Sequence, residues 1–293
     1  MNPSTAHSSD FLTRETGGRH GIRAFGNKAL NCICIGLAFL TLIPLFSIVF
    51  LVFQKGLPLL NFSVFTQLPP AAGVTGGGFG NAVIGTFLMV GIALVIATPF
   101  GILSAIYVNE YAPGSRLANA VRFVAKLLTG IPSIICGVFA YAVIVLTTGG
   151  FSAWAGGFAL AILILPTILL TAEQALLGVP KAYREASYGL GATNFQTIWR
   201  IVLPDALPAI MTGVMLAVAR AAGETAPLIF TALFSQYWIQ SLREPTASLS
   251  VLIYNFSTLP FEHQVQMAWT ASLVLVLLVT AANISAQVVF RKK

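Results

Sequence analysis

The sequence predicts an all-α protein of six membrane-spanning helices, because its composition is strongly apolar and its apolar residues occur in long runs. Of the 293 residues, 57% are hydrophobic and only 9% are charged, against roughly 25% charged residues in soluble domains. A soluble protein so poor in charge could not cover its own surface, whereas a surface that faces lipid needs no charge. The net charge is +7, but no basic patch interleaved with aromatic residues occurs outside the apolar runs, which argues against nucleic acid as a partner.

A helix needs about 20 apolar residues to cross a bilayer, and six runs meet this requirement. The predicted spans are Ala29–Phe53, Gly80–Val108, Val121–Thr147, Trp154–Leu177, Ala206–Phe234 and Val265–Phe290. The first run is longer than the h-region of a secretory signal, which has about 7–15 residues. We therefore expect residues 1–28 to form a mobile tail and residues 29–293 to form the membrane domain. Pro99 predicts a kink or break in the second span, because proline removes a helical hydrogen bond.

The basic residues alternate between the connections. Thirteen of the sixteen Lys and Arg lie in the two termini and in residues 109–126 and 178–205, whereas the intervening connections hold only Lys55 and Arg243. The sixteenth, Arg220, lies inside a span. Because positively charged connections remain in the cytoplasm, both termini are predicted to be cytoplasmic.

The cysteine, glycine and histidine patterns indicate no catalytic, metal or nucleotide site. Cys32, Cys34 and Cys136 lie in apolar runs without a cluster of histidines, which favours small buried hydrophobic residues over metal or redox chemistry. The glycine run at 76–78 lacks the Lys-Ser or Lys-Thr pair of a phosphate-binding loop and is predicted to be a flexible loop. His263 is predicted to be a surface residue. We therefore expect no catalytic residue, metal or cofactor in this chain.

The long 178–205 connection predicts two short helices that meet at an angle. Residues 181–190 contain good helix formers and follow Pro180, a favourable residue at a helix start, and two glycines then interrupt the helix. Asn194 can cap a second short helix, which Leu203-Pro204 is expected to end. Such a pair can lay an apolar face into a groove on a partner or serve as an ordinary amphipathic link, and spacing alone favours neither.

The spacing of this connection resembles the E-A-A-x3-G-x9-I-x-L-P loop of ABC importer permeases. Every spacing matches, and the one departure is Ser187 in place of the second alanine. The resemblance implies a coupling surface for a separate subunit that binds ATP and Mg, so this chain is not expected to be an enzyme. The matching residues are Glu185, Ala186, Ser187, Gly191, Ile201, Leu203 and Pro204.

The fifth apolar run contains two ionisable residues, Arg220 and Glu224, at a spacing that allows them to pair on one helix face. A central arginine costs about 2.5–3.5 kcal/mol on insertion scales, so such groups usually face the bundle interior and are functional. Gly223 and Pro227 predict local unwinding beside the pair. A structural ion pair is one interpretation; an anion site, in which the planar arginine fork matches phosphate oxygens, is favoured. Glu173, near another span end, is predicted to be an interfacial charge.

The residues around this pair resemble the PstA family of bacterial phosphate importer permeases. The resemblance runs from about residue 30 to the C-terminus and is carried by four segments: Gly76-Gly77-Gly78-Phe79-Gly80-Asn81-Ala82, Ile106-Tyr107-Val108-Asn109-Glu110-Tyr111, Gly130-Ile131-Pro132-Ser133-Ile134 and residues 220–232. The related PstC permeases share an R-x-x-G-E-T core, but the Ala-Pro-Leu that follows it here favours PstA.

The resemblance implies a type I ABC importer (MetI-like) fold in the bacterial inner membrane, with alternating access. The chain would form half of a pore for inorganic phosphate, and Arg220, Glu224 and Thr225 would bind the substrate. The implied partners are a PstC-like permease, two PstB-like ATPase subunits, a soluble PstS-like phosphate-binding protein and membrane lipid. Two alternatives are the same scaffold carrying sulfate or molybdate, and a self-sufficient secondary carrier. The complete coupling pattern and the absence of a clear internal repeat argue against the carrier.

Overall fold

The structure is a computed structural model that describes residues 16–289, and the elements in that range are all helical. The predicted all-α fold is therefore confirmed. The chain divides into two compact units, Met1–Gln54 and Lys55–Lys293.

The first unit consists of most of one long helix, α2 (Thr16–Gly56). This helix begins well before the predicted start of the first span, so residues 16–28 of the expected tail are helical, and residues 1–15 lie outside the described part of the chain. Its apolar side chains from Leu30 to Leu51 are exposed. A helix that is apolar on all sides needs lipid or another protein around it.

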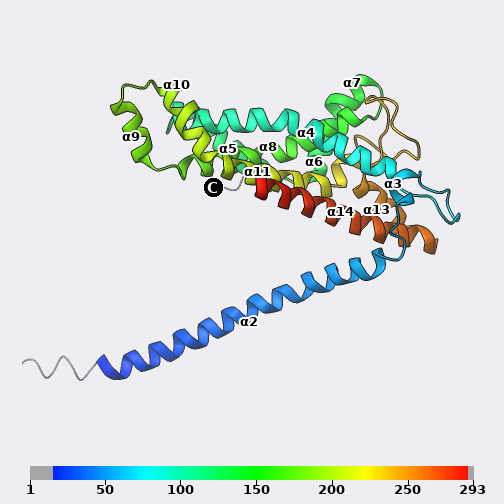
Figure 1. Cartoon of the computed structure of the whole chain (residues 1–293), viewed down its shortest axis with the longest axis horizontal. Helices are drawn as coiled ribbons and strands as arrows, with labels where there is room; N and C mark the ends of the chain where they lie inside the picture. Colours follow the sequence, from blue (N-terminus) through cyan, green and yellow to red (C-terminus); the bar gives the residue numbers. More distant parts are fainter. Residues whose placement is uncertain (1–15, 290–293) are drawn as a thin grey trace, which may run out of the picture. The chain divides into compact units, whose positions relative to one another are not determined.

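The described part of the second unit contains short and long helices (Figure 1) and three π-helical turns. Their bounds are α3 (Ser63–Thr66), α4 (Gly80–Ile106), η1 (Tyr107–Tyr111), α5 (Arg116–Gly130), α6 (Ser133–Ala140), η2 (Tyr141–Val145), α7 (Leu146–Thr148), α8 (Ala153–Leu177), α9 (Lys181–Gly189), α10 (Asn194–Thr197), η3 (Ile198–Val202), α11 (Leu203–Gly223), α12 (Ala226–Ile229), α13 (Leu249–Ser257) and α14 (Glu262–Val289).

Within the described residues, five helical segments are long and apolar enough to cross a membrane: Leu30–Gly56, Gly80–Tyr111, Ala153–Leu177, Asn194–Gly223 and Glu262–Val289. A sixth span exists only if the pair Arg116–Gly130 and Ser133–Thr148, bent by 105°, crosses as one.

The predicted span Val121–Thr147 is not one continuous helix, because it is divided between the segments Arg116–Gly130 and Ser133–Thr148, which meet at a bend of 105°. Ile131 and Pro132 both have extended backbone conformations, with ψ values of 135° and 133°. A proline has no N–H to donate and disfavours helical geometry in the residue before it, so α5 ends and α6 starts in a new direction.

The other prolines had different effects from those expected. Of the kink or break predicted at Pro99, the break is absent, since α4 continues through this residue, and a kink there stays a prediction. Leu203-Pro204 does not end a helix, because the π-helical turn η3 leads directly into α11. In this turn the Leu203 N–H donates to Ile198 O, five residues earlier. The hydrogen-bond pairing thus shifts by one residue just before Pro204, which has no N–H of its own.

Two further boundaries differ from the prediction. The residue that caps α10 is Thr193, not Asn194: the Thr193 hydroxyl accepts from the Gln196 N–H, and the Gln196 side chain accepts from the Thr193 N–H. The connection at 235–264, for which no helix was predicted, contains α13, which begins after Ser248.

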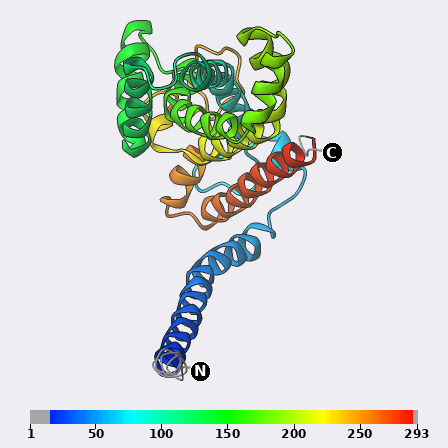
Figure 2. The ribbon, with the colours of Figure 1, turned by 90° about the vertical axis from the view of Figure 1, so that its left-hand side faces the viewer.

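Helix α8 lies at the centre of the second unit, where most of its residues are buried. It packs against α4 and α11 at points where glycine removes the side chain: Gly157 lies against Ile92 of α4, and Gly213 of α11 lies against Thr171. Figure 2 shows the second unit from the end that carries α9, with α14 at the side of the helices around α8. Small residues allow close approach between membrane helices, whose association is driven by packing rather than by burial from water.

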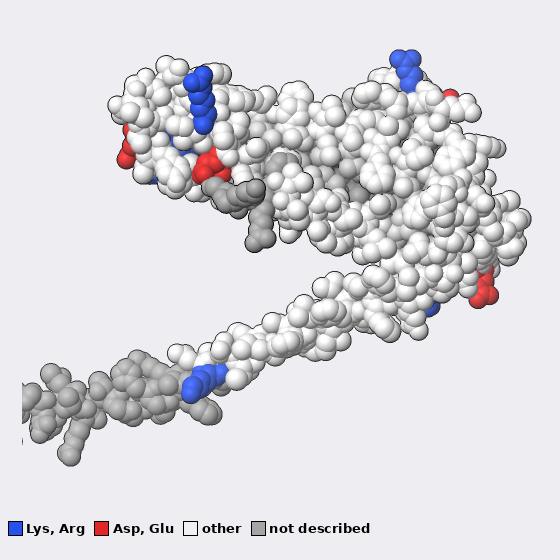
Figure 3. All heavy atoms as spheres, viewed as in Figure 1, with Lys and Arg blue, Asp and Glu red and all other residues white. Residues whose placement is uncertain are grey.

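The connections of the second unit gather at two opposite ends. Helices α9 and α10 lie at one end, and α3 and α7 lie at the other (Figure 1). On the face shown in Figure 3, the Lys, Arg, Asp and Glu side chains of this unit also lie at the two ends, and the surface between them is uncharged. This arrangement agrees with the alternation of connections read from the sequence. Which end faces the cytoplasm stays a prediction.

The packing of Gly85 gives a direct test of this fold. A Cβ atom at Gly85 would lie 1.9 Å from the backbone oxygen of Ala247, whereas a Cβ at Gly91 of the same helix would have no neighbour within 4 Å. Gly85→Ala must therefore displace the chain before α13, at a cost of about 1–3 kcal/mol. We expect its thermal midpoint in detergent to fall by several degrees.

The matched control is Gly91→Ala, which we expect to leave the midpoint unchanged or to raise it, because alanine favours the helix by about 1 kcal/mol over glycine. Equal midpoints for the two variants would contradict the close contact between α4 and residue 247.

Candidate functional site

The first candidate site is the C-terminal end of α11, where Arg220 and Glu224 form an ion pair. The Arg220 Nε lies 3.6 Å from the Glu224 Oε1, so the pair predicted from the spacing is present. The Arg220 side chain is 38% exposed and the Glu224 side chain 18%. The guanidinium group is therefore accessible to a ligand.

The helix ends directly beside this pair. Gly223 is the last residue of α11, and Glu224 has an extended backbone with φ −74° and ψ 128°. Thr225, half-buried, precedes the short helix α12, and its backbone oxygen accepts from the N–H groups of Leu228 and Ile229, both at 3.1 Å. The local unwinding predicted from Gly223 and Pro227 is confirmed.

Two other elements hold this break in place. The Ser250 hydroxyl in the first turn of α13 donates to the backbone oxygen of Glu224 at 2.8 Å. From α6, Gly137 approaches the backbone of Pro227 so closely that a Cβ would lie 2.6 Å from its Cα. Sequence reasoning missed Ser250, because α13 lies in a connection for which no helix was predicted.

Arg220 belongs to an exposed face of α11. Residues three or four positions apart share one side of a helix, and the exposed residues at this spacing are Ala209, Thr212, Leu216, Arg220 and Gly223. The opposite side of α11 packs against α8, where Gly213 and Ala217 are buried. The arginine therefore faces away from the core of this chain. A guanidinium group in this position can bind an oxyanion through two parallel N–H groups.

The second candidate site is the segment 178–205. Glu185 and Ala186 are exposed, and so is Gly191, which adopts a left-handed conformation with φ 80°. Pro204 is exposed, whereas Ile201 and Leu203 are half-buried. The structure thus distributes the residues of the sequence motif over α9, the turn after it, η3 and the start of α11.

Ser187 points into this segment rather than out of it. The side chain is buried, and its Oγ lies 2.8 Å from the Oγ1 of Thr197. The one departure from the E-A-A pattern therefore introduces a hydrogen bond that joins α9 to α10.

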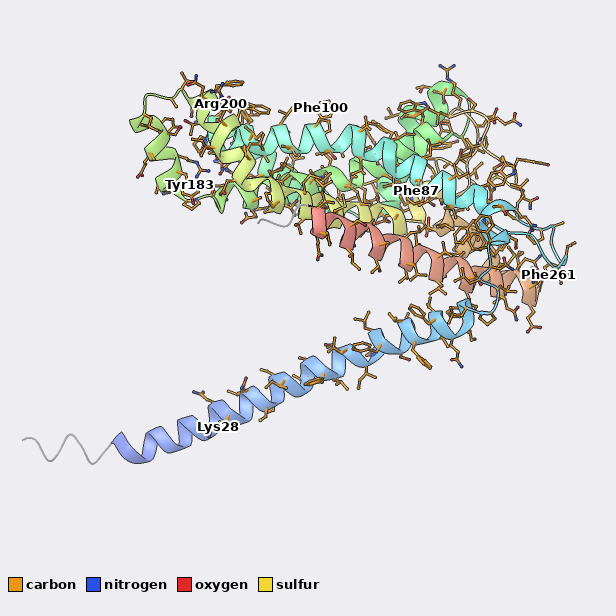
Figure 4. The ribbon with its side chains drawn as sticks, in the orientation of Figure 1. Lys28, Phe87, Phe100, Tyr183, Arg200 and Phe261 are labelled. Carbon is orange, nitrogen blue, oxygen red and sulfur yellow. The ribbon has the colours of Figure 1, made fainter. Side chains whose placement is uncertain are left out.

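The outer surface of the same segment is rich in exposed apolar side chains. Leu190 is 90% exposed, and the rings of Phe195 and Trp199 are exposed with their centroids 5.8 Å apart. Tyr183 and Arg200 lie at this end of the second unit (Figure 4). Exposed apolar residues grouped in this way mark a binding surface for another protein or a membrane.

Sequence reasoning missed a pair of residues that attaches α9 to the rest of the protein. Arg184 donates to both carboxylate oxygens of Glu110, from Nη2 at 2.7 Å and from Nε at 3.2 Å. The motif Asn109-Glu110-Tyr111 was noticed only for its resemblance to a family. The positive charge of the 178–205 connection is the signal from which a basic partner for Glu110 could have been predicted.

Glu173, predicted to be an interfacial charge, is buried and paired with Arg122, and its depth in the membrane stays a prediction. Glu173 is only 5% exposed, and its Oε1 lies 2.5 Å from the Arg122 Nε. Arg122 also donates to Val108 O. A buried carboxylate needs such a partner because burial without one is costly.

The remaining sequence candidates have structural surroundings. Cys136 is buried as predicted, but Cys32 and Cys34 are exposed on α2, because that helix exposes its apolar side chains. His263 is half-buried, and its Nε2 lies 3.0 Å from both the backbone N and the backbone O of Gly76. Within residues 16–289, no group of three or more His, Cys, Asp or Glu side chains could hold a metal ion.

Comparison with known proteins identifies the family. Residues 97–293 match the family described as the binding-protein-dependent transport system inner membrane component. Two solved structures share the fold: a bacterial alginate ABC transporter, with a TM-score of 0.61, 17% identity and coverage of 93% of this chain and 96% of that chain, and the methionine ABC transporter MetNI, with a TM-score of 0.56, 23% identity and coverage of 72% and 92%.

Relatives that share more of the sequence narrow the assignment. The chain is 40% identical over 276 residues to the phosphate transport system permease protein PstA of Haemophilus influenzae, covering 93% of this chain and 98% of that protein. It is 34% identical over 262 residues to a probable PstA of Methanocaldococcus jannaschii, covering 89% and 92%. The chain is therefore an integral membrane protein of the binding-protein-dependent transport permeases and, within them, belongs to the PstA family.

Proposed function

We propose that this chain is the permease subunit that forms half of the translocation pathway of an ATP-driven importer of inorganic phosphate. The carrying observation is the position of Arg220. It lies at the broken end of a membrane-spanning helix, on an exposed face, and inside the segment that resembles PstA. An ionisable residue within a membrane-spanning segment is costly unless it faces a partner or a water-filled path.

The chemistry of the pair suits phosphate. Arg220 offers N–H donors that match the geometry of an oxyanion. Glu224 can hold the guanidinium when the path is empty and can accept a hydrogen bond from a protonated phosphate. Thr225, the next residue after Glu224, adds a hydroxyl group at the break. Sulfate and molybdate are fully deprotonated near neutral pH and have no O–H to donate. A carboxylate that accepts a hydrogen bond from the ligand would therefore disfavour them.

The energy for transport would come from other subunits. The segment 178–205 supports this, since it combines the coupling motif with exposed apolar side chains. We propose a PstC-like permease beside this chain, two PstB-like ATPase subunits that bind ATP and Mg below α9 and α10, and a soluble PstS-like phosphate-binding protein at the opposite end. The chain would lie in the bacterial inner membrane with both termini in the cytoplasm, and it would catalyse no reaction itself.

Arg220→Gln tests the anion site. Because glutamine keeps hydrogen-bonding atoms but loses the charge, we expect ATP-dependent phosphate uptake into proteoliposomes containing the assembled complex to fall at least about tenfold, the effect of losing about 1.4 kcal/mol of stabilisation of the bound anion. ATP hydrolysis by the same complex should persist.

The control for this variant is Arg116→Gln, at an exposed arginine that begins α5, which should leave phosphate uptake unchanged. Normal uptake by Arg220→Gln would leave the ion pair as a structural element only. Uptake of labelled sulfate or molybdate in place of phosphate would support the alternative oxyanion permease.

Leu190→Ser tests the coupling surface. Leu190 is almost fully exposed in this chain, so the substitution should leave the fold unchanged. If a partner covers this side chain, burial of a leucine contributes about 1.5–3 kcal/mol, and the affinity of the purified ATPase subunit should fall about tenfold or more. Leu57→Ser, an exposed leucine outside this segment, should not change that affinity, and an equal affinity for both variants would place the ATPase elsewhere.

A further inference from the structure

We propose that the Arg184–Glu110 ion pair is the mechanical link through which α9 moves the end of α4. Arg184 and Glu110 would thus be positioning residues for transport. This inference rests on the proposed function, because it assumes that an ATPase acts on α9.

Arg184 makes several hydrogen bonds at once, and the Arg184–Glu110 pair is called the clamp below. Its guanidinium binds Glu110 with two hydrogen bonds, of 2.7 Å and 3.2 Å. Its remaining donors bind the end of α8 and the turn after it, with Nη2 3.0 Å from Leu176 O and Nη1 2.8 Å from Val179 O. One side chain of α9 therefore contacts both η1 and the C-terminal end of α8.

Burial makes this clamp stiff. The side chain of Arg184 is 18% exposed and that of Glu110 is 7% exposed. A bidentate arginine–carboxylate pair fixes orientation as well as distance, and loss of one partner leaves a buried charge without compensation. Asn109 adds a further hydrogen bond to Glu110 Oε1 at 2.7 Å. The clamp therefore resists separation of α9 from η1.

The residues next to Arg184 on α9 lie on the protein surface, where a partner can contact them. Glu185, the next residue in the chain, is exposed together with Lys181, whereas Arg184 faces inward. These side chains line an open hollow of about 440 Å³ together with Glu110, Pro113 and Leu177. A partner that contacts the outer face of α9 would thus act one residue away from the clamp.

The turn that contains Glu110, η1, is also hydrogen-bonded to the rest of the helices. η1 is a π-helical turn that continues α4, and its Val108 O accepts from Arg122 Nη2 at 3.1 Å. Arg122 also pairs with Glu173 of α8. A displacement of Glu110 therefore acts on α4 and α8 together, the two helices with the most extensive mutual packing. π-helical turns within α-helices frequently lie at functional sites.

A double variant separates the effect of the ion pair on transport from its effect on folding. The double variant Glu110→Leu with Arg184→Met removes both charges, so that no unpaired charge remains buried, and such replacements of ion pairs by apolar residues often preserve folding. We expect the complex with this double variant to assemble and to hydrolyse ATP. The phosphate transported per ATP hydrolysed should fall about 3- to 30-fold, the range expected when a coupling contact is lost.

Two further variants complete the test. Arg184→Lys keeps the charge but not the bidentate geometry, so it should also lower the phosphate-to-ATP ratio. This variant serves as the test if the double variant does not assemble. Arg116→Gln, at an exposed arginine at the start of α5, should leave the ratio unchanged. A ratio within about twofold of the wild type in an assembled clamp variant would overturn the inference. A wild-type complex without ATP-dependent phosphate uptake would instead contradict the proposed function and, with it, the basis of the link.

Discussion

The structure depends on one constraint: inside a bilayer, every backbone N–H and C=O must find its partner within the protein. This constraint keeps the long apolar runs helical and makes each interruption a place that other residues must cover. At the end of α11 the backbone oxygen of Glu224 accepts a hydrogen bond from the Ser250 hydroxyl. Near the end of α4 the wide turn at η1 is covered by Arg122, which donates to Val108 O. The interruptions are thus also where the polar side chains gather.

Glycine complements this constraint. Lipid offers apolar side chains an environment as favourable as the interior of the protein, so helices associate through close packing. At Gly157 and Gly213 the neighbouring helices approach α8 to distances that a Cβ would prevent. The resulting rigid group of α4, α8 and α11 positions Arg220 on an exposed face and supports Glu110 and Glu173 at the other end of the bundle.

Much of the fold could be predicted, since long apolar runs and prolines are local signals. The Arg220–Glu224 pair was also within reach, because both residues lie on one helix face, four positions apart. The bend at Pro132 was not predicted, since proline either breaks a helix or is tolerated, as at Pro99, according to the packing around it. Glu110 and Arg184, 74 positions apart, and Ser250, 26 positions from Glu224, come together only through the tertiary fold. No spacing rule finds such contacts.

The hydrogen bond between Ser187 and Thr197 has an evolutionary consequence. Both side chains are buried, and a buried hydroxyl that loses its partner costs free energy. Related chains that keep alanine at the position of Ser187 have no hydroxyl to offer there, so selection on the residue opposite should relax toward small apolar side chains. The two positions should consequently vary as a pair across relatives, and an exchange of coupling segments between permeases should carry both residues together.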